Sequence, residues 1–402
     1  MQHPDFLIIG AGIFGITAAL ELRRRGHTVA VLDPGPVPHP LAASTDISKV
    51  VRMEYGSDRL YFDMAEAAIE GWHAWNHLFG EEIYHETGFL LLCREPMESD
   101  SQAFERDSYS LLLEKHYAPQ CLDAATIAAR FPALAAGRYV DGFYNPRAGW
   151  AESGRTVALL CAQARQSGVS VEEGQTADHL VFDGNRVTGV ATREGRTYCA
   201  GHVVLCAGAW SPLLVPELRP VMRATGHPVF HLKPARPELF SFPALPVFAA
   251  DISRTGWYGF PFHPKEGVVK IANHGPGLNL HPEQDERVVT EADTAHLRLF
   301  LGETFPALAD APIVFTRRCL YCDTPDGHFW IDRHPAFEGL TVGTGGSGHA
   351  LKMAPVLGPL ITAAAGGDDH PWLRRFRWRS FSADSPYEEA ARFTGGATST
   401  QI

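Results

Sequence analysis

Phe-Leu-Ile-Ile-Gly-Ala-Gly-Ile-Phe-Gly, residues 6–15, is the stretch that decides the fold. Its apolar start is typical of a buried parallel strand, and the Gly-x-Gly-x-x-Gly spacing is typical of a turn that leads into a helix. Gly10 permits the tight turn, Gly12 lets the backbone approach a pyrophosphate, and Gly15 lets the helix pack closely on the strand. We therefore expect a helix over residues 16–25, directly after the glycines.

An acidic residue completes this pattern at the end of a second apolar strand. Residues 28–32 predict that strand, and Asp33 follows it. The N-terminus of the intervening helix would face the phosphates of a dinucleotide, while Asp33 would accept a hydrogen bond from a ribose hydroxyl. A tight turn between strand and helix without any ligand is the alternative. The complete order favours dinucleotide binding but does not separate FAD from NAD.

A later strand favours a flavoprotein. Residues 202–206 are mostly apolar and end in Ala207-Gly208, after a hairpin that the Asp-Gly-Asn turn at 183–185 predicts. A nucleotide fold that resumes after a long excursion is more typical of a flavoprotein than of a nicotinamide dehydrogenase. The expected FAD-binding domain comprises residues 1–80, 150–212 and 325–385, the substrate domain 81–149 and 213–324, and the C-terminal tail 386–402.

The periodicity of apolar residues adds detail to both expected domains. Helices are predicted at 61–79 and 153–166, and an amphipathic helix at 354–365 follows a strand and a glycine-rich turn at 340–348. The substrate segments alternate apolar and polar residues, which predicts a mostly antiparallel sheet. A cleft between two such domains is the usual place for a substrate.

Composition excludes several classes of protein. The chain has 402 residues, 45% of them hydrophobic, which is ordinary for a globular protein with a large core. A net charge of −11 argues against a nucleic-acid-binding surface. No apolar run approaches the ~18 residues of a membrane span, and no basic region leads into an apolar signal segment. We expect a soluble, cytoplasmic protein with neither a membrane nor a nucleic acid as its partner.

Two cysteines have a spacing that is also found in zinc sites and redox dithiols. Cys319 and Cys322 stand in Cys-x-x-Cys spacing, among seven cysteines in all. Structural zinc would need a second such pair or a histidine pair at ligand spacing, and none is present, so no metal is expected. A redox dithiol normally lies at a helix N-terminus, whereas Asp-Thr-Pro-Asp-Gly after Cys322 predicts a turn. Both hypotheses are therefore weak.

Five separated motifs together resemble one known family. They are the glycine fingerprint with Asp33; Ser-Thr-Asp-Ile-Ser-Lys-Val-Val-Arg-Met-Glu-Tyr-Gly at 44–56; Trp-Tyr-Gly-Phe-Pro at 257–261 with Lys-Ile-Ala-Asn-His at 270–274; Arg-Arg-Cys-Leu-Tyr-Cys-Asp-Thr-Pro-Asp-Gly-His-Phe at 317–329; and Gly-Gly-Ser-Gly-His-Ala-Leu-Lys-Met at 345–353. The chain resembles the monomeric sarcosine oxidase and N-methyltryptophan oxidase family of FAD-dependent amine oxidases. Fructosyl amino acid, saccharopine and pipecolate oxidases are relatives. The resemblance implies an α/β fold like that of D-amino acid oxidase, with a discontinuous Rossmann-like FAD domain and an α+β substrate domain.

The resemblance implies roles for residues near the substrate. Arg52 and Lys352 would bind the substrate carboxylate, one by bidentate geometry and the other as a point charge. Tyr258 and Tyr321 would line the pocket. Lys270 would activate O2, because a fixed cation stabilises the negative charge that forms there. His274 would be catalytic as well. Without the resemblance, the sequence favours a simpler interpretation of each: Lys270 as a solvated lysine on a strand, His274 as a satisfied polar residue, and Lys352 as a lysine in the first turn of a helix.

It also implies a covalent flavin. Cys319 would form a thioether with the flavin 8α-methyl group, and Arg317 and Arg318 beside it could favour the thiolate. Cys322 has no implied role. Lys49 stands where sarcosine oxidases have arginine and fructosyl amino acid oxidases commonly have lysine. The expected cofactor-binding residues are Gly10, Gly12, Ile13, Phe14, Gly15, Asp33, Ser44, Lys49, Ala207, Gly208, Trp210, Cys319, Gly345, Gly346, Gly348, His349 and Lys352.

The expected activity is oxidation of a secondary, N-substituted amino acid by covalent FAD. The resulting imine would hydrolyse and O2 would be reduced to H2O2, with the protein acting by orientation and electrostatics. A fructosyl amino acid oxidase and a cyclic imino acid or D-amino acid oxidase or dehydrogenase remain alternatives. A flavin-bound tRNA-modification or non-catalytic binding protein is a different class, disfavoured by the acidic charge. The family likeness suggests a monomer.

Overall fold

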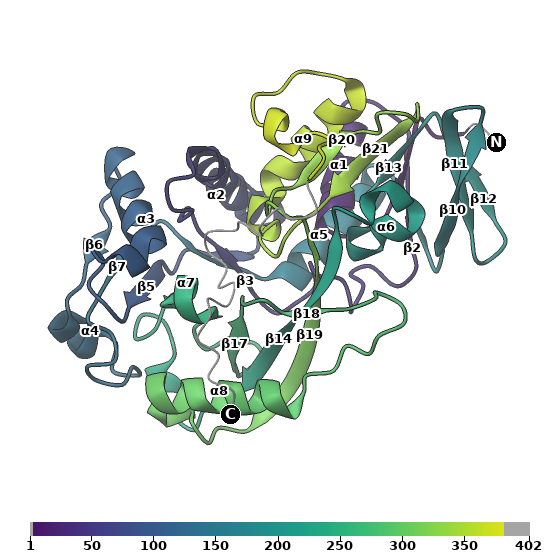
Figure 1. Cartoon of the computed structure of the whole chain (residues 1–402). Coiled ribbons are helices and arrows are strands. Elements are labelled where there is room, and N and C mark those ends of the chain that lie inside the picture. The colour runs from purple at the N-terminus through teal and green to yellow at the C-terminus, as the bar shows by residue number, and fades with distance from the viewer. Residues whose placement is uncertain (1–2, 382–402) are drawn as a thin grey trace.

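A parallel sheet forms the nucleotide-binding part of the molecule. The computed structural model describes residues 3–381, so the predicted tail at 386–402 lies outside the described residues. The strand order is β20-β21-β13-β1-β2-β9, with every pair parallel except β20 with β21. The sheet brings together three distant stretches of the chain (Figure 1). The bounds are β1 Phe6–Ile9, β2 Val29–Asp33, β9 Ser170–Glu173, β13 His202–Leu205, β20 Trp330–Arg333 and β21 Leu340–Thr344.

Helices pack beside this sheet. They are α1 Ile13–Arg24, α2 Arg59–Phe79, α5 Ser153–Gln166 and α9 Ala354–Gly366. Helix α1 begins three residues earlier than predicted, because the amide of Ile16 donates to the carbonyl of Gly12 and the helix starts on the glycine turn itself. The prediction of an amphipathic α9 is wrong. Most of its residues are buried, and at Gly358 it packs so closely on α1 that an added Cβ would lie 2.4 Å from the Thr17 carbonyl oxygen.

A nine-stranded sheet forms the second part. Its order is β18-β14-β17-β16-β15-β5-β7-β6, with β19 also paired to β14, and only β15 with β5 is parallel. The mostly antiparallel sheet predicted for the substrate segments is thus present. The strands are β5 Phe89–Cys93, β6 Gln120–Cys121, β7 Asp141–Asn145, β14 Arg223–Leu232, β15 Val247–Ala250, β16 Trp257–Gly259, β17 Val269–Asn273, β18 Leu278–Asn279 and β19 Ile313–Asp323.

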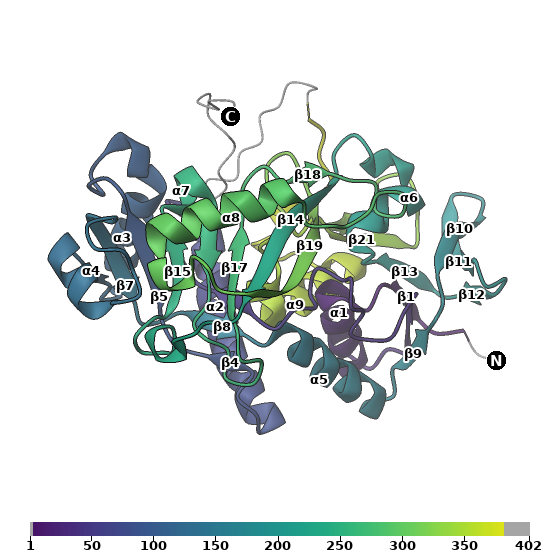
Figure 2. The ribbon, with the colours of Figure 1, turned by 90° about the horizontal axis from the view of Figure 1, so that it is seen from below.

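Helix α8, Glu291–Thr304, covers one face of this sheet (Figure 2). Its Leu297, Phe300 and Leu301 join a buried apolar cluster with the strands, so the sheet has a core of its own. The division into domains at the predicted boundaries stays a prediction. The smaller elements are the sheet β3 Lys49–Val51, β4 Tyr84–His85 and β8 Gly149–Ala151; the sheet β10 Ala177–Asp183, β11 Arg186–Thr192 and β12 Thr197–Cys199; and helices α3 Ala103–Glu114, α4 Ala124–Arg130, α6 Ser211–Leu214 and α7 Ile252–Thr255.

Candidate active site

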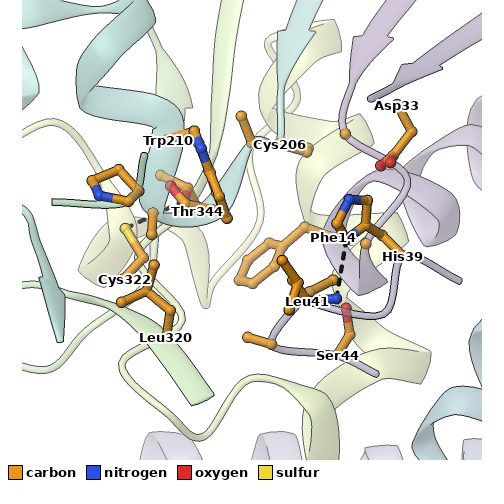
Figure 3. A pocket seen from close by; sticks show the side chains of 18 of the residues that line it. Phe14, Asp33, His39, Leu41, Ser44, Cys206, Trp210, Leu320, Cys322 and Thr344 are labelled. Atoms are coloured by element: carbon orange, nitrogen blue, oxygen red, sulfur yellow. Dashed lines mark hydrogen bonds between the residues drawn. The ribbon is translucent and has the colours of Figure 1, made fainter. Parts of the chain in front are cut away.

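A cavity of about 600 Å³ opens at the carboxyl ends of β1, β2 and β13. Figure 3 shows Phe14, Asp33 and Ser44 on one side of it, and Trp210, Leu320 and Cys322 on the other. The position agrees with the rule that open parallel sheets bind ligands beyond the carboxyl ends of their strands. Of the residues predicted for the site, those lining the cavity are Gly10, Gly12, Ile13, Phe14, Asp33, Ser44, Lys49, Ala207, Gly208, Trp210, Tyr321, Gly346 and Gly348.

The glycine turn has no room for side chains. Gly10 has φ +98°, and a Cβ there would lie 2.6 Å from the Cys206 carbonyl oxygen. A Cβ on Gly15 would lie 1.9 Å from the Gly10 carbonyl oxygen, so only glycine lets α1 approach β1 this closely. Ser44 crosses over the turn, and its Oγ accepts a hydrogen bond from the Ile13 amide at 3.2 Å. The turn therefore presents bare backbone at the start of a helix, as a pyrophosphate requires.

Asp33 lies at the end of β2 and faces this turn. Its carboxylate accepts hydrogen bonds from the amides of Ala11 at 2.8 Å and Gly35 at 3.2 Å. Burial raises the pKa of Asp33, although both amides oppose the rise. The carboxylate keeps further acceptor capacity on the cavity side, since each oxygen carries two lone pairs. Backbone turn, helix start and acid together fit the phosphates and a ribose of a dinucleotide.

Cys319 and Tyr321 lie on one face of β19. Both are buried and share an apolar cluster with Val229 and Ala272. Lys49 Nζ donates to Cys319 Sγ at 3.8 Å. Burial would lower the pKa of Lys49, but its electrostatic interactions with Cys319 and Asp46 raise it overall. The cation next to the thiol is thus Lys49.

The prediction that Arg317 and Arg318 favour the thiolate is wrong for Arg318. Successive side chains of a strand point to opposite faces, so Arg318 points away from Cys319. Its guanidinium pairs with Asp293 and donates to the Val288 carbonyl. Arg317 shares the face of Cys319 but donates to the backbone carbonyls of 42 and 45.

A buried ion pair lies next to this cysteine. Lys270, on β17, donates from Nζ to Asp46 Oδ2 at 2.7 Å and to the Ser48 carbonyl. The two side chains are 1% and 2% exposed. Burial lowers the pKa of Lys270 to about 8, with Asp46 opposing the fall and Lys49 adding to it. Burial would raise the pKa of Asp46, but Lys270, His231, Lys49 and Arg317 together outweigh burial and hold this pKa well below its ordinary value.

Arg52 and Lys352 converge on Tyr55. The Arg52 guanidinium carbon lies 5.2 Å from the centre of the Tyr55 ring, and Lys352 Nζ lies 4.9 Å from the same centre. Lys352 also donates to the Tyr55 hydroxyl at 3.1 Å. Arg52 Nη1 is buried and has no hydrogen-bond partner among the described residues. Two cations thus lie close to one tyrosine ring, and Arg52 has a buried nitrogen that lacks an acceptor among the described residues.

Aromatic and histidine side chains complete the site. His227, on β14, stacks on Tyr321 with 4.2 Å between ring centres, and His274 lies 6.0 Å from both rings. Tyr258 packs against the cluster that contains Tyr321. The predicted pocket residues Tyr258, Tyr321 and His274 are therefore neighbours.

Comparison with known proteins decides the family. Residues 5–364 match the family of FAD dependent oxidoreductases. The chain belongs to this family. It is 31% identical to a monomeric sarcosine oxidase of Streptomyces avermitilis, over 91% of this chain and 95% of the relative, and 28% identical to an L-saccharopine oxidase of Schizosaccharomyces pombe, over 93% and 92%. The crystal structure of fructosamine oxidase (Amadoriase II) from Aspergillus fumigatus superposes with a TM-score of 0.83 at 27% identity, covering 98% of this chain and 94% of that one.

This FAD dependent oxidoreductase is an enzyme of the amine or amino acid oxidase type. The fold predicted from the resemblance, like that of D-amino acid oxidase, is confirmed. In the described part of the chain no helix is long and apolar enough to cross a membrane, and no group of three or more potential ligands is placed to hold a metal ion. Its cellular location and its oligomeric state stay predictions.

Nine predicted site residues are not among those that line the cavity: Gly15, Arg52, Tyr258, Lys270, His274, Cys319, Gly345, His349 and Lys352. Gly15 packs α1 on the glycine turn, and Gly345 has φ +69° at the end of β21. His349 holds Tyr55 by a hydrogen bond of 3.0 Å to its hydroxyl. Cys319 is fully buried between Lys49 and the strands.

Sequence reasoning missed Asp46, His227 and Arg287. Arg287 lines the cavity, with its guanidinium carbon 4.7 Å from the centre of one Trp210 ring and a hydrogen bond of 3.2 Å to the Leu41 carbonyl. Asp46 lies within the motif at 44–56, and its charge among mostly uncharged neighbours is the signal that could reveal it. Nothing in the sequence marks His227 or Arg287.

Proposed function

We propose that the protein oxidises the carbon–nitrogen bond of a secondary, N-substituted amino acid, such as sarcosine or another N-alkyl amino acid. Water then hydrolyses the imine product, and O2 is reduced to H2O2. The observation that carries this proposal is the convergence of Arg52 and Lys352 on Tyr55, with Arg52 Nη1 buried and lacking an acceptor among the described residues. A substrate carboxylate supplies that acceptor, because a buried guanidinium nitrogen without a partner is unfavourable.

Bound FAD supplies the two-electron oxidation. The chain's own residues orient the amine and stabilise charge. The carboxylate clamp fixes one end of the substrate, and Tyr258, Tyr321 and His274 enclose the other. Lys270 is a fixed, buried cation that stabilises the negative charge developing on O2. With a pKa of about 8, Lys270 keeps its proton at neutral pH.

Cys319 is proposed to hold the flavin covalently. The link would replace the thiol S–H bond and one C–H bond of the flavin 8α-methyl group by an S–C bond. O2 would accept the two electrons and two protons released and form H2O2. Lys49, 3.8 Å from Sγ, stabilises the thiolate.

Acid precipitation of the purified holoenzyme tests this tether. We expect the yellow colour to stay with the protein pellet in wild type and in Cys322→Ala, and to pass to the supernatant in Cys319→Ala. Cys322 is the matched control because it lies on the same strand and lines the cavity. Flavin released entirely from wild type would contradict a covalent link.

A fructosyl amino acid is the second candidate substrate. Lys49 supports it, as does the similarity to the Aspergillus fumigatus fructosamine oxidase. Both candidates share the clamp and differ only in the group on nitrogen.

A substrate panel with peroxide detection tests the function. The panel contains sarcosine, N-methyltryptophan, a fructosyl amino acid, saccharopine, pipecolate and a D-amino acid. We expect peroxide with at least one secondary amino acid, and loss of turnover when its carboxylate is replaced by an amide. Turnover only with an artificial electron acceptor would contradict the proposal that O2 is the electron acceptor. A preference for the D-amino acid would contradict the proposal that the substrate is a secondary amino acid. Gel filtration tests the further proposal that the enzyme is a monomer.

A further inference from the structure

Asp46 lies at the centre of a buried group of positive charges. Its Oδ2 accepts from Lys270 Nζ at 2.7 Å and lies 3.8 Å from Lys49 Nζ, while its Oδ1 lies 3.6 Å from His231 Nε2. The Asp46 side chain is 2% exposed. These partners come from β3, β14 and β17, three strands that are far apart in the sequence. One carboxylate thus connects strands β3 and β17, which carry Lys49 and Lys270, the two lysines with roles in the proposed function.

The geometry fixes the direction of the Lys270 side chain. Its ammonium has two acceptors, Asp46 and the Ser48 carbonyl, and both belong to the segment that precedes β3. The Phe260 ring centre lies 4.6 Å from Nζ on another side. A buried ammonium needs such a partner, because burial without one favours the neutral amine.

Lys49 lies between the Asp46 carboxylate and Cys319, the residue proposed to bind the flavin covalently. Its Nζ lies 3.8 Å from Asp46 Oδ2 and 3.8 Å from Cys319 Sγ. Asp46 therefore lies between the proposed oxygen-activating lysine and the lysine beside the flavin-linking thiol.

We propose that Asp46 is a positioning residue that holds the Lys270 ammonium in place and protonated, and couples it electrostatically to Lys49 beside Cys319. This inference rests on the proposed function, in which Lys270 assists the reaction with O2. The titratable and charged groups that face this pair are His231 on β14, Lys49 on β3, Tyr258 on β16, and Arg317 and Cys319 on β19.

The expected effect of Asp46→Asn has a definite sign. Asp46 raises the pKa of Lys270, and burial and Lys49 lower it. Without the carboxylate charge, Lys270 loses its proton at lower pH. An opposite charge at this distance shifts a pKa by about 1–3 pH units. The midpoint of the pH profile should therefore fall from about 8 by that amount, and the rate with O2 at pH 8 should fall by at least about fivefold.

The test uses chemically reduced holoenzyme mixed with O2 in a stopped-flow instrument from pH 6 to 10, so no amine substrate is needed. A pH titration of the visible spectrum of the oxidised holoenzyme is a second readout, and it involves no turnover. Asp46→Glu keeps the charge and should keep the midpoint near that of wild type. Asp293→Asn is the matched control, because it removes a carboxylate from buried Arg318 on β19 and should leave the midpoint unchanged.

The double variant Asp46→Asn with Lys270→Met provides a second test if Asp46→Asn alone folds poorly. Removing both partners of a buried pair is tolerated better than removing one. Asp46→Asn should therefore cause no further loss of the O2 rate in a Lys270→Met background. A further loss there, or an unchanged midpoint in Asp46→Asn, overturns the proposal. A wild-type rate of reaction with O2 in Lys270→Met would instead overturn the oxygen role of Lys270. Absence of turnover with every compound of the substrate panel would overturn the proposed substrate class. In both cases the pH titration of the visible spectrum still tests Asp46.

Discussion

Substitution of Gly348 by alanine tests the packing beside Tyr321. Gly348 has φ +78°, a conformation that disfavours any side chain, and it lines the cavity. An added Cβ would lie 2.3 Å from Tyr321 Cε2 and 2.7 Å from Cδ2. The tyrosine ring cannot easily move away, because it is buried and stacks on His227 at 4.2 Å between ring centres. The new methyl group must therefore displace an aromatic ring.

Two contributions add to the expected loss of stability. The left-handed backbone costs alanine about 1 kcal/mol. Overpacking against a confined ring adds about 1–3 kcal/mol. Gly80→Ala separates the two, because Gly80 has φ +60° and a Cβ added there would meet no atom of the described residues within 4 Å. We expect Gly80→Ala to lower the free energy of unfolding by about 1 kcal/mol and Gly348→Ala to lower it by about 2–4 kcal/mol.

Urea unfolding of the two holoenzyme variants beside wild type measures the difference. Steady-state kinetics add a functional readout, since a displaced Tyr321 should raise KM for the amine in Gly348→Ala but not in Gly80→Ala. Equal losses of stability in the two variants, together with an unchanged KM, would refute the reasoning.

Three further predictions concern other parts of the molecule. Because the pKa of Lys270 is about 8, the rate of reaction of the reduced enzyme with O2 should fall about tenfold between pH 7 and pH 9; stopped-flow measurements should show this fall in wild type and a slow, flat profile in Lys270→Met. Gly15→Ala would place a Cβ 1.9 Å from the Gly10 carbonyl oxygen, so the purified variant should lack flavin absorbance, and a wild-type flavin content would contradict the described turn. Asp293→Asn leaves Arg318 buried without its carboxylate and should lower the free energy of unfolding by about 3–5 kcal/mol, as urea titration would show.

Local features of the fold could be predicted from the sequence because they depend on neighbours in the chain. The turn at Gly10 and the acid at Asp33 lie within one βαβ unit, and the structure places them together as expected. The character of α9 could not be predicted in this way. The sequence of α9 is rich in small residues and predicts a helix with one exposed face. In the structure most of α9 is buried, and it packs closely on α1 at Gly358, a contact that the sequence does not reveal.

The charged part of the site depends on contacts between distant residues. Lys270 and Asp46 are 224 residues apart, and a lysine on a strand has the same sequence pattern whether it is solvated or buried. The resemblance to a family pointed to Lys270 but gave no partner. Arg318 shows the opposite case, since strand alternation alone already predicts that it points away from Cys319.

Alternate residues of β19 belong to different parts of the site, because successive side chains of a strand point to opposite faces. It pairs with β14 without interruption from Arg317 to Asp323, and the irregularity of the ladder lies at His231, near its other end. Cys319 and Tyr321 belong to one cluster, whereas Leu320 and Cys322 belong to another. Inserting or deleting a single residue upstream within this strand would exchange the two sets. Any redesign of the enzyme must therefore change the length of β19 by two residues at a time, or Cys319 and Tyr321 move together to the opposite face of the strand.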